Sequence, residues 1–206
     1  MSPAAEDDRR KLLAAAFQMP SVQTMLSRKS SITNAFVSAL VPVNPPSLEE
    51  IDEALRILGM EAGDVRCAYC GDKASEWDHL RPLVLKRRPT GYISEIANLV
   101  PACGKCNQSK GNSAWREWML STSAPLSPTM RGLERVADRI ARLEAYEQWR
   151  APTRVDFESV LGCDGWKHYW SLYEGVIDQL RQCQQVADIL RVKIGDSLQK
   201  PKPPVD

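Results

Sequence analysis

The sequence is short of histidine, of net charge and of long apolar runs. Of its 206 residues only two are histidines, and 27 Lys and Arg residues nearly balance 26 Asp and Glu residues, so the formal net charge is +1. A hydrophobic share of 43% with so small a net charge excludes intrinsic disorder over the whole length. No apolar run approaches the roughly 18 residues of a membrane span. The N-terminal stretch MSPAAEDDRR lacks the pattern of a secretory signal. We therefore expect a globular, cytoplasmic protein without a membrane partner.

The balanced total hides an uneven distribution of charge along the chain. Residues 1–62 carry 6 basic and 8 acidic side chains, residues 63–122 carry 9 and 6, and residues 123–206 carry 12 of each. The excess positive charge therefore lies in the middle third. A difference of three charges gives only a weak indication of a polyanionic partner.

The six cysteines are more informative than the charge. Four of them form two CxxC pairs separated by 32 residues: Cys67, Cys70, Cys103 and Cys106. In a cytosolic chain this spacing is typical of a four-thiolate zinc site, because a two-residue spacer lets both sulfurs reach one ion at about 2.3 Å. Four protein thiolates leave no open position for water, so we expect the zinc to be structural. The two single cysteines, Cys163 and Cys183, are expected to behave as small buried hydrophobic residues.

The sequence predicts helices on both sides of this middle block. The one over 47–59 has the strongest start signal, since Ser47 precedes Glu50 by three residues as in a capping box. The middle block is expected to end in a helical stretch around Trp115 and Trp118. The other helices are expected over residues 6–18, 31–41, 128–149 and 164–194.

The apolar positions of 164–194 alternate in steps of three and four residues over about three heptads, from Tyr173 to Ile194. Two interpretations stay open. The seam packs against 128–149 within one chain, or it joins two copies of the chain.

These patterns predict an α+β fold that is mainly helical. We expect an N-terminal helical region over 1–62, a small zinc-stapled core over 63–122, a C-terminal helical region over 123–198 and a flexible tail over 199–206. A hairpin and one helix bury too little apolar area to be stable alone, so a metal is expected to hold the core together.

The residues suited to catalysis lie between and just behind the cysteine pairs. His79 directly follows Asp78, Asn98 precedes the second pair, and that pair continues as CxxCNxxK through Asn107 and Lys110. Histidine suits a general base at neutral pH. Asp78 and His79 would leave a strand on opposite faces, so one could serve a metal ion and the other a water molecule.

This combination, in this order, resembles the HNH endonuclease family, which has a ββα-metal active site. The resemblance covers about a quarter of the chain. It implies that His79 is the general base, that Asp78 and Asn107 bind a catalytic divalent metal, and that Asn98 holds the loop and orients His79. The last letter of the name HNH stands for a histidine at this metal-ligand position, whereas this sequence has Asn107. Because its side chain offers an amide oxygen, we expect Mg²⁺ or Mn²⁺ to bind there.

Double-stranded DNA is the partner that follows from this resemblance. We expect phosphate contacts from the basic residues of the motif, which are Arg81, Lys86, Arg87, Arg88 and Lys110. One such site cuts one strand, so a double-strand cutter would need two copies, most simply a homodimer.

The sequence thus predicts a metal-dependent DNA endonuclease, and its free-standing size is similar to that of HNH-type restriction or defence enzymes. One alternative is a nonspecific or nicking nuclease of phage or mobile-element origin. Another is a zinc-ribbon DNA-binding protein without catalysis, although such a binder has no need for Asp78, His79, Asn98 and Asn107 together.

Overall fold

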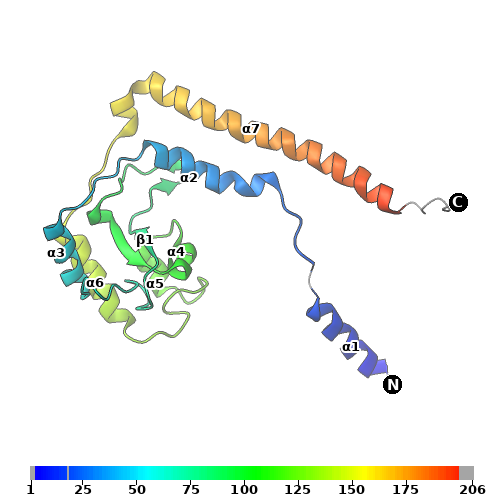
Figure 1. Cartoon of the computed structure of the whole chain (residues 1–206), viewed down its shortest axis with the longest axis horizontal. Coiled ribbons are helices and arrows are strands. Elements are labelled where there is room, and N and C mark those ends of the chain that lie inside the picture. The colour runs from blue at the N-terminus through cyan, green and yellow to red at the C-terminus, as the bar shows by residue number, and fades with distance from the viewer. Residues whose placement is uncertain (1–2, 18, 200–206) are drawn as a thin grey trace. The chain divides into compact units, whose positions relative to one another are not determined.

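The computed structural model describes residues 3–17 and 19–199 (Figure 1). By their contacts these residues divide into two compact units. One is Ser30–Val176, and the other combines the described residues up to Lys29 with those from Ile177 onwards. None of the described helices has the length and apolarity needed to cross a membrane.

The described chain is mainly helical, with two small sheets, so the predicted α+β class is confirmed. The helical elements are α1 (Pro3–Ala16), η1 (Met25–Arg28), α2 (Lys29–Leu40), α3 (Leu48–Leu58), η2 (Ile96–Asn98), α4 (Gly104–Lys110), α5 (Trp115–Leu120), α6 (Val136–Trp149) and α7 (Phe157–Gln199). The strands are β1 (Glu76–His79), β2 (Val84–Leu85), β3 (Arg88–Pro89) and β4 (Leu99–Ala102).

Each sheet has two antiparallel strands. Strand β1 pairs with β4, so that Asp78 lies opposite Val100 and His79 opposite Leu99. The long connection between them contains the β2–β3 hairpin. Helix α4 follows β4 directly and packs against β1. Together β1, β4 and α4 form the two-strand, one-helix core that the cysteine and histidine motif predicts.

Helix α3 begins as its sequence predicts. The Ser47 hydroxyl accepts from the Glu50 amide at 3.2 Å, and the Glu50 carboxylate accepts from the Ser47 amide at 2.9 Å. At the other end Gly59 adopts the left-handed conformation (φ 66°), which glycine adopts without steric cost. The capping box is therefore confirmed.

Helix α6 is shorter than the 128–149 segment expected from the sequence. Gly132 and Arg135 have φ values of 62° and 59°, and an α-helix cannot continue through such left-handed residues. The helix therefore begins only at Val136.

One apolar core joins α3, α5 and α6 to the β1–β4 sheet and the cysteine segments. Helices α3 and α6 pack side by side (Figure 1), and their buried residues Leu58 and Leu143 belong to the same cluster. Within it Tyr69 meets Trp118 edge-on, with ring centroids 5.3 Å apart. The flanking helices therefore complete the core that the small sheet cannot form alone.

The first part of α7 belongs to the same unit. Its Tyr169 hydroxyl donates to the Phe36 carbonyl of α2 at 2.8 Å, and its Tyr173 hydroxyl lies 2.8 Å from Thr33 Oγ1. Gly162 interrupts the helix with φ 74°, so the regular part begins close to the residue 164 expected from the sequence.

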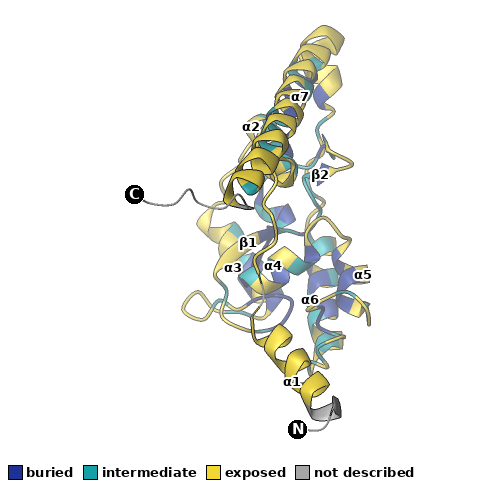
Figure 2. Ribbon diagram, turned by 90° about the vertical axis from the view of Figure 1, so that its right-hand side faces the viewer, coloured by how far each residue is buried: buried dark blue, intermediate teal, exposed yellow. Residues whose placement is uncertain are grey.

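The smaller unit consists of α1, η1 and the rest of α7. Gln184 of α7 accepts from the Met25 amide at 2.6 Å. Figure 2 shows α1 and the end of α7 almost wholly exposed, and apolar side chains such as Leu190 (51%) and Ile194 (60%) are among those exposed.

Cys163 lies in the larger unit, just after the Gly162 break in α7. Its side chain is exposed, so the expectation that it is buried is wrong.

Candidate functional site

Four buried sulfurs gather at one end of the β1–β4 sheet. The sulfur atoms of Cys67, Cys70, Cys103 and Cys106 all lie within 4.8 Å of one another. The first cysteine pair is held to the second by the Ala68 amide, which donates to the Pro101 carbonyl at 2.8 Å. Among the described residues this is the one group of three or more Cys, His, Asp or Glu side chains close enough to hold a metal.

The spacing of these sulfurs fits a tetrahedral metal. Ligands at about 2.3 Å from a tetrahedral zinc are roughly 3.8 Å apart, and Cys70 Sγ lies 3.7 Å from Cys103 Sγ. Hydrogen bonds from Cys106 and Cys70 lower the pKa of Cys67 to about 4, so the cluster supports a thiolate. These cysteines could therefore hold a metal ion such as zinc.

Arg131 lies beside this cluster and adds positive charge to it. Burial alone would lower its pKa, but a hydrogen bond and the charges of Cys70 and Cys106 outweigh that effect and raise it. Arg131 also pairs with Asp72 at 3.6 Å. A four-thiolate metal site carries net negative charge, and this guanidinium offsets part of it.

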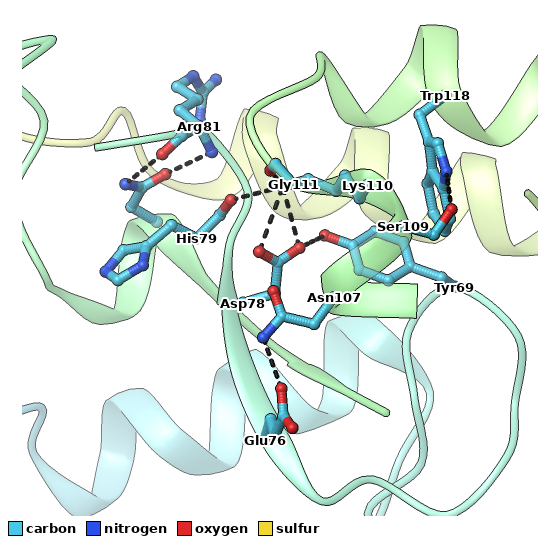
Figure 3. A network of polar contacts seen from close by, with 11 residues as sticks. Tyr69, Glu76, Asp78, His79, Arg81, Asn107, Ser109, Lys110, Gly111 and Trp118 are labelled. Carbon is cyan, nitrogen blue, oxygen red and sulfur yellow. Dashed lines mark hydrogen bonds and ion pairs between the residues drawn. The ribbon is translucent and has the colours of Figure 1, made fainter. Parts of the chain in front are cut away.

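Strand β1 separates its side chains onto two faces. Figure 3 shows the Asp78 carboxylate and the His79 imidazole leaving β1 in different directions, as alternation along a strand requires. Glu76, two residues before Asp78, projects from the same face as Asp78. Helix α4 adds Asn107 and Lys110 on that side.

The Asp78 carboxylate is buried and has two strong partners. The Tyr69 hydroxyl donates to Oδ2 at 2.6 Å, and the Lys110 ammonium lies 3.0 Å from the same oxygen and 3.2 Å from Oδ1. Burial raises the pKa of Asp78, and Lys110 and Tyr69 offset only part of that effect. Lys110 also donates to the carbonyls of His79 and Gly111, at 3.0 and 3.2 Å.

The imidazole of His79 is oriented by a hydrogen bond to one of its two nitrogens. Its Nε2 lies 2.8 Å from the Ser94 hydroxyl. The backbone of Ser94 is fixed in turn, because its amide donates to the Pro42 carbonyl at 3.1 Å and its carbonyl accepts from the Asn44 amide at 2.8 Å. Burial, helped by the charge of Lys110, lowers the pKa of His79 to about 4. The ring is therefore neutral at neutral pH.

Asn98 is fully buried and connects the two ends of the loop between β1 and β4. Its side-chain oxygen accepts from the Arg81 amide at 2.8 Å, and its side-chain nitrogen donates to the carbonyls of Arg81 and Ile93, at 3.0 and 3.4 Å. The resemblance implies that Asn98 holds this loop and orients His79, and the side chain in direct contact with the imidazole is Ser94.

Asn107 is oriented by Glu76. Its Nδ2 donates to Glu76 Oε2 at 2.7 Å, and Figure 3 shows its amide oxygen turned toward the Asp78 carboxylate. Carboxylate and amide oxygens are the ligands that hard cations prefer in proteins. The donor set of Asp78 and Asn107 therefore fits a hard divalent cation.

The structure corrects one of the expected DNA contacts and changes the setting of two others. Lys110 cannot reach a phosphate, because its side chain is 0% exposed and bound to Asp78. Arg81 pairs with Glu147 at 2.9 Å. Arg88 lies over the Trp170 ring, 4.3 Å from its centroid, and pairs with Glu174 at 3.5 Å.

Lys86 and Arg87 are placed differently, at the exposed tip of the β2–β3 hairpin. Both have positive φ values, 48° and 63°, as a two-residue type I′ turn requires. Within the described part of the chain neither side chain takes part in an ion pair. This tip can therefore contact an anionic partner.

Sequence reasoning missed three residues of the site. Glu76 had a signal, because period-two alternation in a strand places it on the face of Asp78. Tyr69 lies between the two cysteines of the first pair and meets Asp78 only after the cysteine segment folds onto β1. Ser94 had no local signal, since its contact with His79 depends on tertiary structure.

Comparison with known proteins identifies this segment. Residues 67–113 match the family model described as HNH endonuclease, so the resemblance predicted from the motif is confirmed for this part of the chain. The CRISPR-associated endonuclease Cas9 of Corynebacterium diphtheriae is 32% identical over 96 residues. That match covers 39% of this chain and 8% of Cas9, so the chain spans a small fraction of its relative. No solved structure matches the chain.

Proposed function

We propose that this protein is a metal-dependent DNA endonuclease that hydrolyses phosphodiester bonds with His79 as the general base. The observation that carries the proposal is the arrangement around β1. A neutral imidazole lies on one face, and a carboxylate and an amide oxygen converge on the other, within the segment that matches the HNH endonuclease model. Nuclease activity needs both a proton acceptor and a site for positive charge near the phosphate.

His79 supplies the proton acceptor. We assign the ring proton to Nε2, which donates to the Ser94 hydroxyl, so Nδ1 keeps its lone pair. Nδ1 takes a proton from a water molecule as the water oxygen forms its bond to phosphorus. The bond from phosphorus to the 3′ oxygen then breaks, and that oxygen takes a proton from solvent water, which leaves 5′-phosphate and 3′-hydroxyl ends.

Asp78 and Asn107 would hold the catalytic metal, which we propose to be Mg²⁺ or Mn²⁺. A divalent cation bound there supplies positive charge to the phosphate and the departing oxygen. Glu76 keeps the Asn107 amide oxygen turned toward Asp78, and Lys110 keeps the Asp78 carboxylate in place.

The four cysteines would hold a structural zinc ion. Cys106 lies one residue before Asn107 on α4, and the first cysteine pair leads into β1. A metal at this end of the sheet therefore fixes the separation between the strand of Asp78 and the helix of Asn107.

We further propose that the enzyme acts on double-stranded DNA as a homodimer in restriction or defence. The support is the set of exposed apolar residues on α7, such as Leu190 and Ile194. Light scattering of the purified chain tests this part independently: a mass of two chains supports the dimer, and a monomer at micromolar concentration contradicts it.

The test of the core proposal is cleavage of supercoiled and linear phage DNA, modified and unmodified, with and without added Mg²⁺. Discrete Mg²⁺-dependent fragments would support a sequence-specific endonuclease. A smear or nicked circles would favour a nonspecific or nicking nuclease. DNA that is retarded in a gel but never cut would contradict catalysis and favour the zinc-ribbon binding protein.

A further inference from the structure

A surface groove is lined by residues that directly follow His79, the proposed general base. It has a volume of about 580 Å³ and begins at Leu80 and Arg81, the residues that follow His79. This volume lies in the range of about 300–1,000 Å³ typical of pockets that hold small ligands. Four basic side chains and a single acidic one line the groove: Arg81, Lys86, Arg116, Arg154 and Glu147.

Tyr92 lies in this groove with two guanidinium groups near its ring. The guanidinium carbons of Arg81 and Arg154 are each 5.8 Å from the centre of its ring. An antiparallel bridge pairs Tyr92 with Arg154, and the Arg154 Nε donates to the Thr90 carbonyl at 3.3 Å. The half-buried ring and the exposed Arg154 are therefore fixed beside each other.

Two carboxylates of α6 hold two of the arginines that line the groove. Glu147 pairs with Arg81 at 2.9 Å, and Glu144 pairs with Arg116. One hydrogen-bond donor in the lining has no partner: Arg81 Nη1 is buried without a hydrogen bond. By contrast, the described structure places neither Lys86 nor Arg154 in an ion pair, so both keep their charge available.

We propose that this groove binds one nucleotide of the DNA substrate that has left the duplex stack, with its base against Tyr92 and its phosphate near Lys86 and Arg154. Inside a duplex both faces of a base are covered by neighbours, so only an unstacked base can lie on an aromatic ring. Guanidinium groups beside the ring strengthen such stacking and attract phosphate. This proposal rests on the proposed nuclease function and adds the form of substrate that the site takes.

The test measures binding without catalysis. The His79→Ala protein, without chelator and without added Mg²⁺ or Mn²⁺, is titrated against a fluorescent duplex with one unpaired nucleotide, the same duplex fully paired, and a single strand of the same sequence. We expect tighter binding of the bulged duplex than of the paired duplex. Adding Tyr92→Ala should abolish that preference and weaken binding of the single strand by roughly tenfold or more. Adding Tyr92→Phe, which keeps the ring, should leave both unchanged.

Salt dependence separates stacking from charge. Tyr92→Ala should leave the slope of log affinity against log salt unchanged, whereas Arg154→Ala should reduce it by about one. Arg154→Ala also tests the groove if the Tyr92 variant does not fold, as judged by thermal unfolding.

Three results would overturn the proposal. The bulged duplex binds no more tightly than the paired duplex, or Tyr92→Ala binds every probe like its parent. The third is that polyglutamate, a polyanion without bases, displaces the probes equally well from the proteins with and without Tyr92. Absence of cleavage by the unmodified enzyme would contradict the nuclease proposal instead, since none of these titrations depends on catalysis.

Discussion

The Lys110 ammonium lies 3.0 Å from Asp78 Oδ2, and its side chain has no exposure to solvent. This pair joins α4 to β1 at the point where the proposed metal ligands meet. A buried charge that loses its partner is strongly unfavourable, whereas a buried pair removed as a whole is often tolerated. The pair therefore makes the geometry of the site depend on Lys110.

Lys110→Met should lower the free energy of unfolding by about 3–5 kcal/mol, because it leaves the Asp78 carboxylate buried and uncompensated. The double variant Asp78→Asn with Lys110→Met should regain part of this loss, and urea unfolding measures both. Had Lys110 been a DNA contact, its loss would reduce the salt dependence of binding and leave stability unchanged. That pattern would contradict the structural role.

Removal of the proposed structural metal should unfold the core. Cys103→Ser, or chelation of the purified protein, is expected to abolish the thermal transition of the Ser30–Val176 unit as followed by circular dichroism, because the metal joins the segment before β1 to α4. Cys163→Ser is the matched control, since this thiol is exposed and lies outside the cluster. Equal melting of the two variants would show that the four cysteines hold no stabilising metal.

Ser94→Ala should slow DNA cleavage about fivefold without lowering the melting temperature, because one hydrogen bond of about 1 kcal/mol orients the imidazole. Ser94→Thr retains the hydroxyl and should restore the rate. A rate loss that persists in the threonine variant would assign the effect to packing and not to the hydrogen bond with His79.

Alanine in place of both Lys86 and Arg87 should weaken binding equally for all DNA sequences and reduce the salt slope by about two, since both lie at an exposed turn. Arg88→Ala provides the contrast. Its guanidinium rests on Trp170, so we expect a loss of stability and little change in the slope. If Arg88→Ala changes the slope as much as the double variant, the hairpin tip is not the main contact.

Local signals explain what could be predicted from the sequence. The capping box of Ser47 and Glu50 and the two CxxC pairs act within a few residues, and so they appear in the structure as expected. The sequence could also have revealed Glu76, because strand alternation alone places it beside Asp78.

Tertiary contacts explain what could not be predicted. From the sequence, Lys110 is expected to contact phosphate as a basic residue of the CxxCNxxK segment, but the fold of α4 against β1 turns it inward to a buried carboxylate. Ser94 reaches His79 because the segment around Pro42 fixes its backbone, a contact that no local pattern records. The late start of α6 depends on left-handed residues, of which Arg135 carries no sequence signal.

The central claim is that His79 acts as the base, and single-turnover DNA cleavage with Mg²⁺ by His79→Ala tests it most directly. The matched control is His168→Ala, since His168 is exposed on α7 outside the site. We predict that His79→Ala cleaves about 10²–10⁴-fold more slowly with unchanged melting temperature and metal content, while His168→Ala cleaves at the parental rate. Cleavage by a folded His79→Ala protein at the parental rate would contradict the account.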